Sequence, residues 1–193
     1  MEEFIQQGPK LPKNLYQSDN LLQDYLSSFL PKEMFQTIEP DLNQLGKRAS
    51  NDILKMALDA EMHLPLHIPY DEWGNRIDKI QVAQGWEELN KVSAEEGLIS
   101  IAYERKYGEY SRTYQFAKNF LFSPSSAVYS CPLAMTDGAA KLIEMYGDDN
   151  LKQRAFKHLI SRNPTEFWTS GQWMTEKSGG SDVGRTETIA KLI

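Results

Sequence analysis

Apolar residues recur at helical spacing along most of the first 160 residues of the chain. Between residues 22 and 29, two leucines, a tyrosine and a phenylalanine stand at i, i+3, i+4 and i+7, on one face of a helix. A side-chain oxygen of Ser18 or Asp19 can accept hydrogen bonds from the free amides of the first turn, and Pro31 cannot continue the helix. The pattern therefore predicts an amphipathic helix that ends before residue 31.

A longer series of apolar positions runs from residue 42 to residue 60. Pro40 and Asp41 suit the first turn of this helix, because a proline there loses no hydrogen bond that the helix needs. Pro65 and Pro69 are expected to end this helix. The turn-forming pair Gly74-Asn75 then lies near β-branched residues, which predicts a small hairpin or a loop.

Helical periodicity returns three times, within residues 82–89, 110–121 and 139–146. Gly147 is expected to stop the last of these helices. Asp148 can cap a further short helix that carries the apolar residues of the segment 151–159. These elements predict a helical bundle over residues 1–163.

The residues that follow Asn163-Pro164 favour strands, with aromatic residues and threonines in 167–175 and a second β-prone run in 186–193. The predicted fold class is therefore mainly α, an N-terminal helical domain followed by the first strands of a β-barrel domain over residues 164–193. One or two strands are not stable without partners. We therefore expect the chain to be the N-terminal part of a longer protein.

Composition and charge narrow the class of protein. The 193 residues are 40% hydrophobic and 25% charged, and 21 Lys and Arg against 27 Asp and Glu give a net charge of -6. This acidic balance does not favour a nucleic-acid or anionic-membrane surface, which needs concentrated positive charge. No membrane-length apolar run and no signal peptide are present, and the single cysteine cannot form an internal disulfide. We expect an intracellular, soluble protein.

Three histidines and one cysteine are candidates for special chemistry. His63 and His67 have the i, i+4 spacing of metal ligands on a helix, but Pro65 interrupts the helix between them, so no metal site is expected. His158 is expected to be solvated. Cys131 is expected to be a buried, small apolar residue.

Two further patterns are more typical of packing than of binding. Four tyrosines lie between residues 103 and 114 and are expected to contribute to a core or an interface. The small residues of the segment 137–142, with the sequence DGAAKL, would allow two helices to approach closely. We prefer that interpretation of the segment to a ligand-binding role.

The segment 171–184, GQWMTEKSGGSDVG, is unusually polar and rich in glycine. Its paired glycines, Gly179 and Gly180, permit positive φ and expose main-chain amides, which can form a concave anion site. Thr175 and Ser181 add hydroxyl groups, and Trp173 adds a flat apolar surface. These groups suit a ligand with a planar polar ring and a phosphate, although the same residues are also common in simple turns.

The run WMTEKSGGSDVG resembles the flavin-binding signature of the acyl-CoA dehydrogenase family, in which Met-Thr-Glu or Val-Thr-Glu is followed after three residues by Gly-Ser-Asp. Lys177 stands where many dehydrogenases carry proline. At this position the sequence is similar to the branch of the family that includes the bacterial alkylation-response flavoproteins. The upstream residues 131–161 resemble the helix pair that precedes the signature in the family. The order of helices first and β-structure second also agrees.

The resemblance implies FAD as the cofactor. Trp173, Met174 and Thr175 would lie along the flavin ring, with the Thr175 hydroxyl and main-chain groups bonding its polar edge. Gly180 and Ser181 would contact the pyrophosphate, and Ser181 would also lie near the thioester of the bound substrate. Glu176 belongs to the signature, and we expect it to hold the turn and to have no catalytic role.

The resemblance also implies the reaction, the α,β-dehydrogenation of an acyl-CoA substrate. A carboxylate removes the α-proton while a β-hydride passes to the flavin. The family places that carboxylate in its C-terminal helical domain, so no catalytic residue is assigned to this chain. An electron-accepting flavoprotein partner and a homo-oligomer are implied for the complete protein.

An alternative function is a flavin-containing protein of the alkylation-response type that binds nucleic acid and has little dehydrogenase activity. Lys177 and Gly179 in the signature motivate this alternative, and the acidic balance of the chain opposes it.

Overall fold

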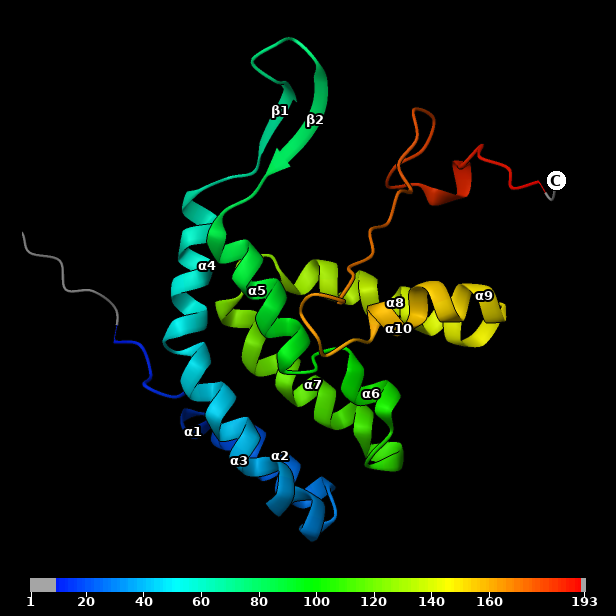
Figure 1. Cartoon of the computed structure of the whole chain (residues 1–193). Coiled ribbons are helices and arrows are strands. Elements are labelled where there is room, and N and C mark those ends of the chain that lie inside the picture. The colour runs from blue at the N-terminus through cyan, green and yellow to red at the C-terminus, as the bar shows by residue number, and fades with distance from the viewer. Residues whose placement is uncertain (1–9, 192–193) are drawn as a thin grey trace, which may run out of the picture.

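Helices carry most of the chain in the computed structural model, which describes residues 10–191 (Figure 1). The longer helices and the two strands follow one another as α2 (Asn20–Phe29), α3 (Lys32–Ala49), α4 (Asp52–Met62), β1 (Leu66–Tyr70), β2 (Arg76–Gln81), α5 (Gln84–Glu95), α7 (Ser111–Phe122) and α8 (Ser130–Tyr146). The short helices are α1 (Leu15–Ser18), α6 (Ser100–Glu104), α9 (Asp149–Leu151) and α10 (Lys157–Leu159). The mainly α fold class is confirmed.

Side-chain caps start the first helices. The Asn14 Oδ1 atom accepts hydrogen bonds from the amides of Tyr16 and Gln17, at 3.0 and 3.2 Å, and begins α1. Asp19 caps α2, because its Oδ1 accepts from the Leu22 amide at 2.8 Å. This confirms one of the two caps predicted for the helix, which ends at Phe29 before the proline at position 31.

The helix predicted to begin at Pro40 was placed wrongly. α3 begins eight residues earlier, at Lys32, and contains Pro40 in its interior. Met34 and Ile38 are buried on the same face as Leu42, so packing continues across the proline and outweighs the hydrogen bond that is lost there. The predicted continuous helix is also divided, because Ser50 and Asn51 separate α3 from α4.

The predicted hairpin is confirmed. β1 and β2 pair in an antiparallel ribbon with Leu66 opposite Gln81, and a register irregularity lies before Tyr70. Gly74 has φ +81°, the left-handed conformation that this turn requires and that glycine adopts without strain. The ribbon stands clear of the helices (Figure 1), and all of its residues except Ile68 are exposed.

The core lies among α3 to α8, and its largest fully buried side chains include Leu42, Leu45, Phe122 and Tyr129. Tyr103 and Tyr114 are also buried, and Tyr107 and Tyr110 are half-buried against the same cluster. The prediction that these four tyrosines contribute to packing is confirmed.

A buried ion cluster joins α3 and α7 to Glu96, the residue that follows α5. The Lys118 side chain is 3% exposed, and its Nζ lies 2.7 Å from Asp41 Oδ2 and 2.8 Å from Glu96 Oε2. The second carboxylate oxygen of Glu96 accepts from Arg48 of α3. Lys118 and Arg48 therefore balance two carboxylates, and pairing of this kind is the condition under which a lysine is tolerated inside a protein.

The end of the helical domain follows the predicted stop and cap. Gly147 caps the end of α8 with its amide bonded to the Ile143 carbonyl at 2.8 Å, and Asp148 Oδ1 accepts from the Leu151 amide at 2.7 Å. The helix that this cap begins contains one π-helical stretch, Lys152–Phe156, between α9 and α10.

Within the residues described, the segments 167–175 and 186–193 form no paired strand. Within 164–191 the chain is extended or turned, with one short 3₁₀ turn at Val183–Arg185. A strand exists only when a neighbour accepts its hydrogen bonds, and no such neighbour lies beside this segment in the described part of the chain. The last two residues of the second predicted strand lie outside the described residues.

Candidate functional site

The five residues predicted to bind a cofactor lie together on the exposed segment that follows the helical domain (Figure 1). The Trp173 indole is 97% exposed, so its face is open to a ligand. None of the five lies in the helical core. They are Trp173, Met174, Thr175, Gly180 and Ser181.

Glu176 closes this segment into a loop. Its amide donates to the Gly179 carbonyl at 2.6 Å, and its carboxylate accepts from the amides of Glu187 and Thr188 at 2.9 and 3.1 Å. Hydrogen bonds from Thr188 and then from Glu187 hold the pKa of the Glu176 carboxyl below its usual range. The expected structural role of Glu176 is therefore confirmed.

The loop leaves main-chain donors available. Within residues 10–191, no hydrogen bond is recorded from the amides of Met174, Thr175, Gly180 or Ser181. A Cβ atom at Gly180 would meet only the Thr175 methyl group, at 3.5 Å, so that side of the loop is open. Free amides beside two hydroxyls and an exposed indole form a donor set that fits an anionic ligand with a flat ring.

Several contacts attach the segment to the helical domain. Phe167 is buried in the core, and the Trp168 ring stacks on the His158 imidazole with ring centroids 4.3 Å apart. Ser170 donates its amide to Thr136 Oγ1 of α8 at 2.9 Å. His158 was expected to be solvated, and with this stacking its side chain is partly exposed.

A groove of about 910 Å³ lies between α7 and α8. Phe116 and Phe120 contribute exposed aromatic rings from α7, and Ala134 and Gly138 present small surfaces from α8. The apolar surface dominates, and the volume falls in the range of small-molecule sites. The remaining lining residues are Ile99, Arg112, Asn119, Ser123, Ser130, Cys131, Leu133, Asp137 and Lys141.

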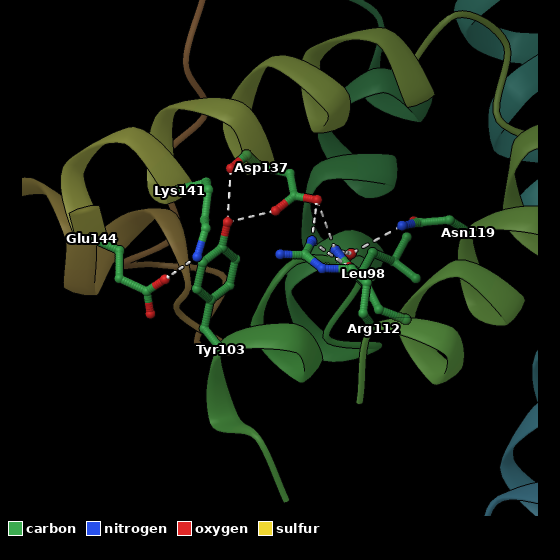
Figure 2. Close-up of polar contacts among 8 residues, drawn as sticks. Leu98, Tyr103, Arg112, Asn119, Asp137, Lys141 and Glu144 are labelled. Carbon is green, nitrogen blue, oxygen red and sulfur yellow. Dashed lines mark hydrogen bonds and ion pairs between the residues drawn. The ribbon is translucent and has the colours of Figure 1, made fainter. Parts of the chain in front are cut away.

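Three charged residues of the groove lining, Arg112, Asp137 and Lys141, take part in the polar contacts that Figure 2 shows. Asp137 accepts from Arg112 Nη1 at 2.6 Å and from the Tyr103 hydroxyl at 2.6 Å. Burial, reinforced by the bond to Asp137, raises the pKa of the Tyr103 hydroxyl. Lys141, which pairs with Glu144 at 2.9 Å, supplies a half-exposed ammonium beside the groove. The groove is therefore apolar along its walls, and the charged groups beside it are paired with one another.

A second set of hydrogen bonds fixes α7 beside the groove. Gln115 and Asn119 of α7 both donate side-chain amides to the Leu98 carbonyl, at 2.8 and 3.2 Å (Figure 2). These bonds orient α7 against the residues before α6, so the groove wall is held by polar contacts as well as by packing.

The sequence interpretation missed this groove for two reasons. Cys131 is exposed on the groove wall and is not the buried residue that was expected. In the segment 137–142 the expected close packing holds for Ala140, which is fully buried, but Gly138 is exposed and faces the groove. The missed signal was the pair Phe116 and Phe120, two aromatic residues at i, i+4 on the polar side of a helix.

The two histidines with metal-ligand spacing do not act together. His63 bonds to Asp59 at the end of α4, and His67 lies on β1 beside Asp78. Among residues 10–191, no group of three or more His, Cys, Asp or Glu side chains is arranged to hold a metal ion. Within the same residues, none of the helices combines the length and the apolar character that crossing a membrane requires.

Comparison with known sequences identifies relatives over nearly the whole chain. The family model for the N-terminal domain of the adaptive response protein AidB matches residues 6–163. Acyl-CoA dehydrogenase family member 11 of Caenorhabditis elegans is 43% identical over 195 residues, which cover 98% of this chain and 31% of the relative. The putative acyl-CoA dehydrogenase AidB of Escherichia coli is 25% identical over 199 residues, which cover 98% of this chain and 36% of the relative.

Solved structures give the same result for the fold. Bd2924 in its apo form is 53% identical, with a TM-score of 0.89, over 93% of this chain and 36% of that protein. Caenorhabditis elegans ACDH-11 in complex with C11-CoA is 42% identical, with a TM-score of 0.89, over 99% of this chain and 34% of that protein. The chain thus spans about a third of the length of these relatives. It belongs to the acyl-CoA dehydrogenase family, with an N-terminal domain of the AidB type.

Proposed function

We propose that the chain is the N-terminal part of an FAD-dependent acyl-CoA dehydrogenase and that residues 173–181 bind the cofactor. The observation that carries this proposal is the loop closed by Glu176, which combines free main-chain amides with two hydroxyls and an exposed indole. Family membership supports the same assignment. When bound, FAD would supply the hydride acceptor for dehydrogenation.

Each predicted residue has a distinct task in this proposal. The Trp173 ring and the backbone of Met174 and Thr175 would hold the flavin ring, because a flat surface and main-chain donors match a planar polar heterocycle. The Gly180 and Ser181 amides, with the Ser181 hydroxyl, would hold the pyrophosphate, because successive amides attract an anion. Ser181 would also contact the thioester end of the substrate.

The cofactor assignment can be tested in the complete protein with Thr175→Val and Ser181→Ala together. Removing two hydroxyl donors is expected to lower the amount of FAD retained after gel filtration about ten-fold or more. The matched control is Thr186→Val with Ser178→Ala, which removes the same groups from the same segment at positions without a predicted contact. Equal flavin content in both double variants would contradict the assignment.

The substrate of the proposed enzyme is an acyl-CoA, and its acyl chain would occupy the α7–α8 groove. The walls from Phe116 and Phe120 suit a hydrocarbon chain. One solved relative was crystallised with C11-CoA, a ligand of this class.

This placement predicts a selective effect of charge in the groove. In the complete protein, Phe120→Asp would bring a carboxylate against the hydrocarbon chain and weaken acyl-CoA binding about ten-fold or more in calorimetry. Leu142→Asp is the control, because Leu142 is exposed on α8 outside the groove. If both variants bind acyl-CoA as tightly as the wild type, the acyl chain of the ligand does not lie in this groove.

Nucleic-acid binding is not favoured by the described surface. The net charge is -6, and many of the cations of the described residues are already paired with carboxylates. The paired residues are Arg48, Arg76, Lys91, Arg105, Arg112, Lys118, Lys141 and Arg162. An electron-accepting flavoprotein and a homo-oligomer remain predictions for the complete protein.

A further inference from the structure

A buried threonine of α8 holds the segment that carries the cofactor loop, residues 173–181. The Ser170 amide donates to Thr136 Oγ1 at 2.9 Å, and Figure 1 shows the segment passing beside α8 before it reaches the loop. Beyond Ser170, each hydrogen bond recorded for the described residues 171–191 joins two residues of that same range. Thr136 therefore accepts the last recorded hydrogen bond between the loop and the helical domain.

Thr136 is itself fixed within its helix. Its side chain is fully buried, on the same face of α8 as the buried Leu133 and Ala140. The hydroxyl donates to the Pro132 carbonyl, four residues earlier, at 2.7 Å. Because this bond uses the only proton of the hydroxyl, the oxygen can act only as an acceptor toward Ser170. The directions of both hydrogen bonds are thus set by the helix.

A second buried hydroxyl shows which part of this arrangement is special. Ser93 of α5 is equally buried, and its Oγ donates to the Leu89 carbonyl, also four residues earlier and also at 2.7 Å. Within the described chain, no amide is recorded as a donor to Ser93 Oγ. A threonine inside a helix does not favour that helix, since it is a poorer helix former than alanine. The contact with Ser170 is therefore what distinguishes Thr136.

The link between this contact and the loop is short. Only Gly171 and Gln172 separate Ser170 from Trp173, so the Cα atoms of residues 170 and 173 lie at most about 11 Å apart. Gly171 has no side chain to restrict its own backbone. The position from which the loop leaves α8 is therefore set by the hydrogen bond one residue earlier.

We propose that Thr136 is a positioning residue for the flavin, because its bond to the Ser170 amide fixes the point from which the cofactor loop leaves α8. The proposal rests on the proposed function of residues 173–181. A loop held at its base presents Trp173 and Ser181 together to one ligand. A loop without this bond spends only a fraction of its time in that arrangement, and its apparent affinity for FAD falls by the same fraction.

The test measures the Kd of the complete apoprotein for FAD by fluorescence titration, together with the Tm in the absence of FAD. Thr136→Val keeps the shape of the side chain and removes the hydroxyl, so the Kd is expected to rise about five-fold or more. Thr136→Ser keeps the hydroxyl and is expected to restore the Kd to within about two-fold of the wild type. Equal weakening in both variants would overturn the proposal, because the methyl group would then hold the loop.

Ser93→Ala is the matched control. It removes a buried hydroxyl that makes the same bond within its helix but has no recorded contact with the segment 164–191. It is expected to leave the Kd for FAD unchanged even where it lowers the Tm. If Thr136→Val binds FAD as tightly as Ser93→Ala, the role of Thr136 is only structural and the proposal is wrong.

Ser170→Pro removes the same hydrogen bond from the other side, because proline has no amide proton. It leaves the core of α8 intact and so provides the test if Thr136→Val does not fold. Combined with Thr136→Val, it should weaken FAD binding about as much as the stronger single variant. Additive losses, or wild-type affinity in Ser170→Pro, would contradict the proposal. Absence of FAD binding by the wild type would instead overturn the proposed function of residues 173–181.

Discussion

The helical domain and the segment that follows it are stabilised in opposite ways. In residues 10–163, apolar faces meet one another inside the chain, and the buried ammonium of Lys118 has two carboxylate partners. In residues 171–191 almost every side chain is exposed, and the loop depends on hydrogen bonds to one carboxylate, that of Glu176. The stability of the protein and its proposed cofactor chemistry therefore lie in different regions, and substitutions can separate the two.

The largest effect is expected from the helical core. Phe122→Ala empties a fully buried position and should lower the free energy of unfolding of this domain by about 3–5 kcal/mol. Hydrogen exchange of the α3 and α7 amides in the complete protein measures this loss. Trp173→Ala, in the exposed segment, should change the same quantity by less than about 0.5 kcal/mol. Comparable losses in the two variants would mean that the two regions contribute equally to the stability of the domain.

A second large effect is expected from the buried ion cluster. Lys118→Met leaves the carboxylates of Asp41 and Glu96 close together without their shared cation, so the domain should lose about 3 kcal/mol of stability. Lys91→Met is the control, because Lys91 forms an exposed pair with Glu88 at 2.6 Å, and its loss should change the stability much less. Hydrogen exchange measures the stability of both variants. Equal losses would mean that burial does not determine how much an ion pair contributes to the stability of the domain.

The two regions also differ in how far the sequence predicts them. Helices were predictable where periodicity and caps agree, as at Asp19 and Asp148, since both signals are local. Pro40 misled the prediction because packing across the proline depends on α7 and the other helices around α3. In the segment 164–191 the signature indicated the chemistry of the site. Strand pairing could not be predicted there, because a strand requires a partner that the local sequence does not specify.

The groove shows the same limit at the level of a site. The predicted cofactor residues are contiguous in sequence, so a motif could indicate them. The groove combines Phe116 and Phe120 of α7 with Gly138 of α8, and only the fold brings these residues together. Gly138 was therefore assigned to packing, which the structure contradicts.

A smaller effect is expected where the two regions meet. Trp168→Ala removes the ring that stacks on His158 and should weaken the local attachment by about 1 kcal/mol. Exchange of the amides of residues 168 and 170, which bond to His158 and Thr136, should then become faster, while the amides of α7 keep their protection. If the α7 amides lose protection equally, the segment is part of the cooperative helical unit, and the two regions are not energetically separate.

The smallest effect is expected within the loop, and it depends on pH. The pKa of Glu176 is lowered in the folded loop, so its carboxylate stabilises the loop above the pKa of an unfolded glutamate, near 4.3, and this contribution is lost as the pH falls through the lower, folded value. The amides of Glu187 and Thr188 should stay protected from pH 7 to about 5 and lose protection below about 4. Glu176→Gln should remove most of this dependence, because a neutral amide accepts more weakly and does not titrate in this range. If the protection of these two amides has the same pH profile in both proteins, another group holds the loop, and the carboxylate is not what separates this segment from a simple exposed turn.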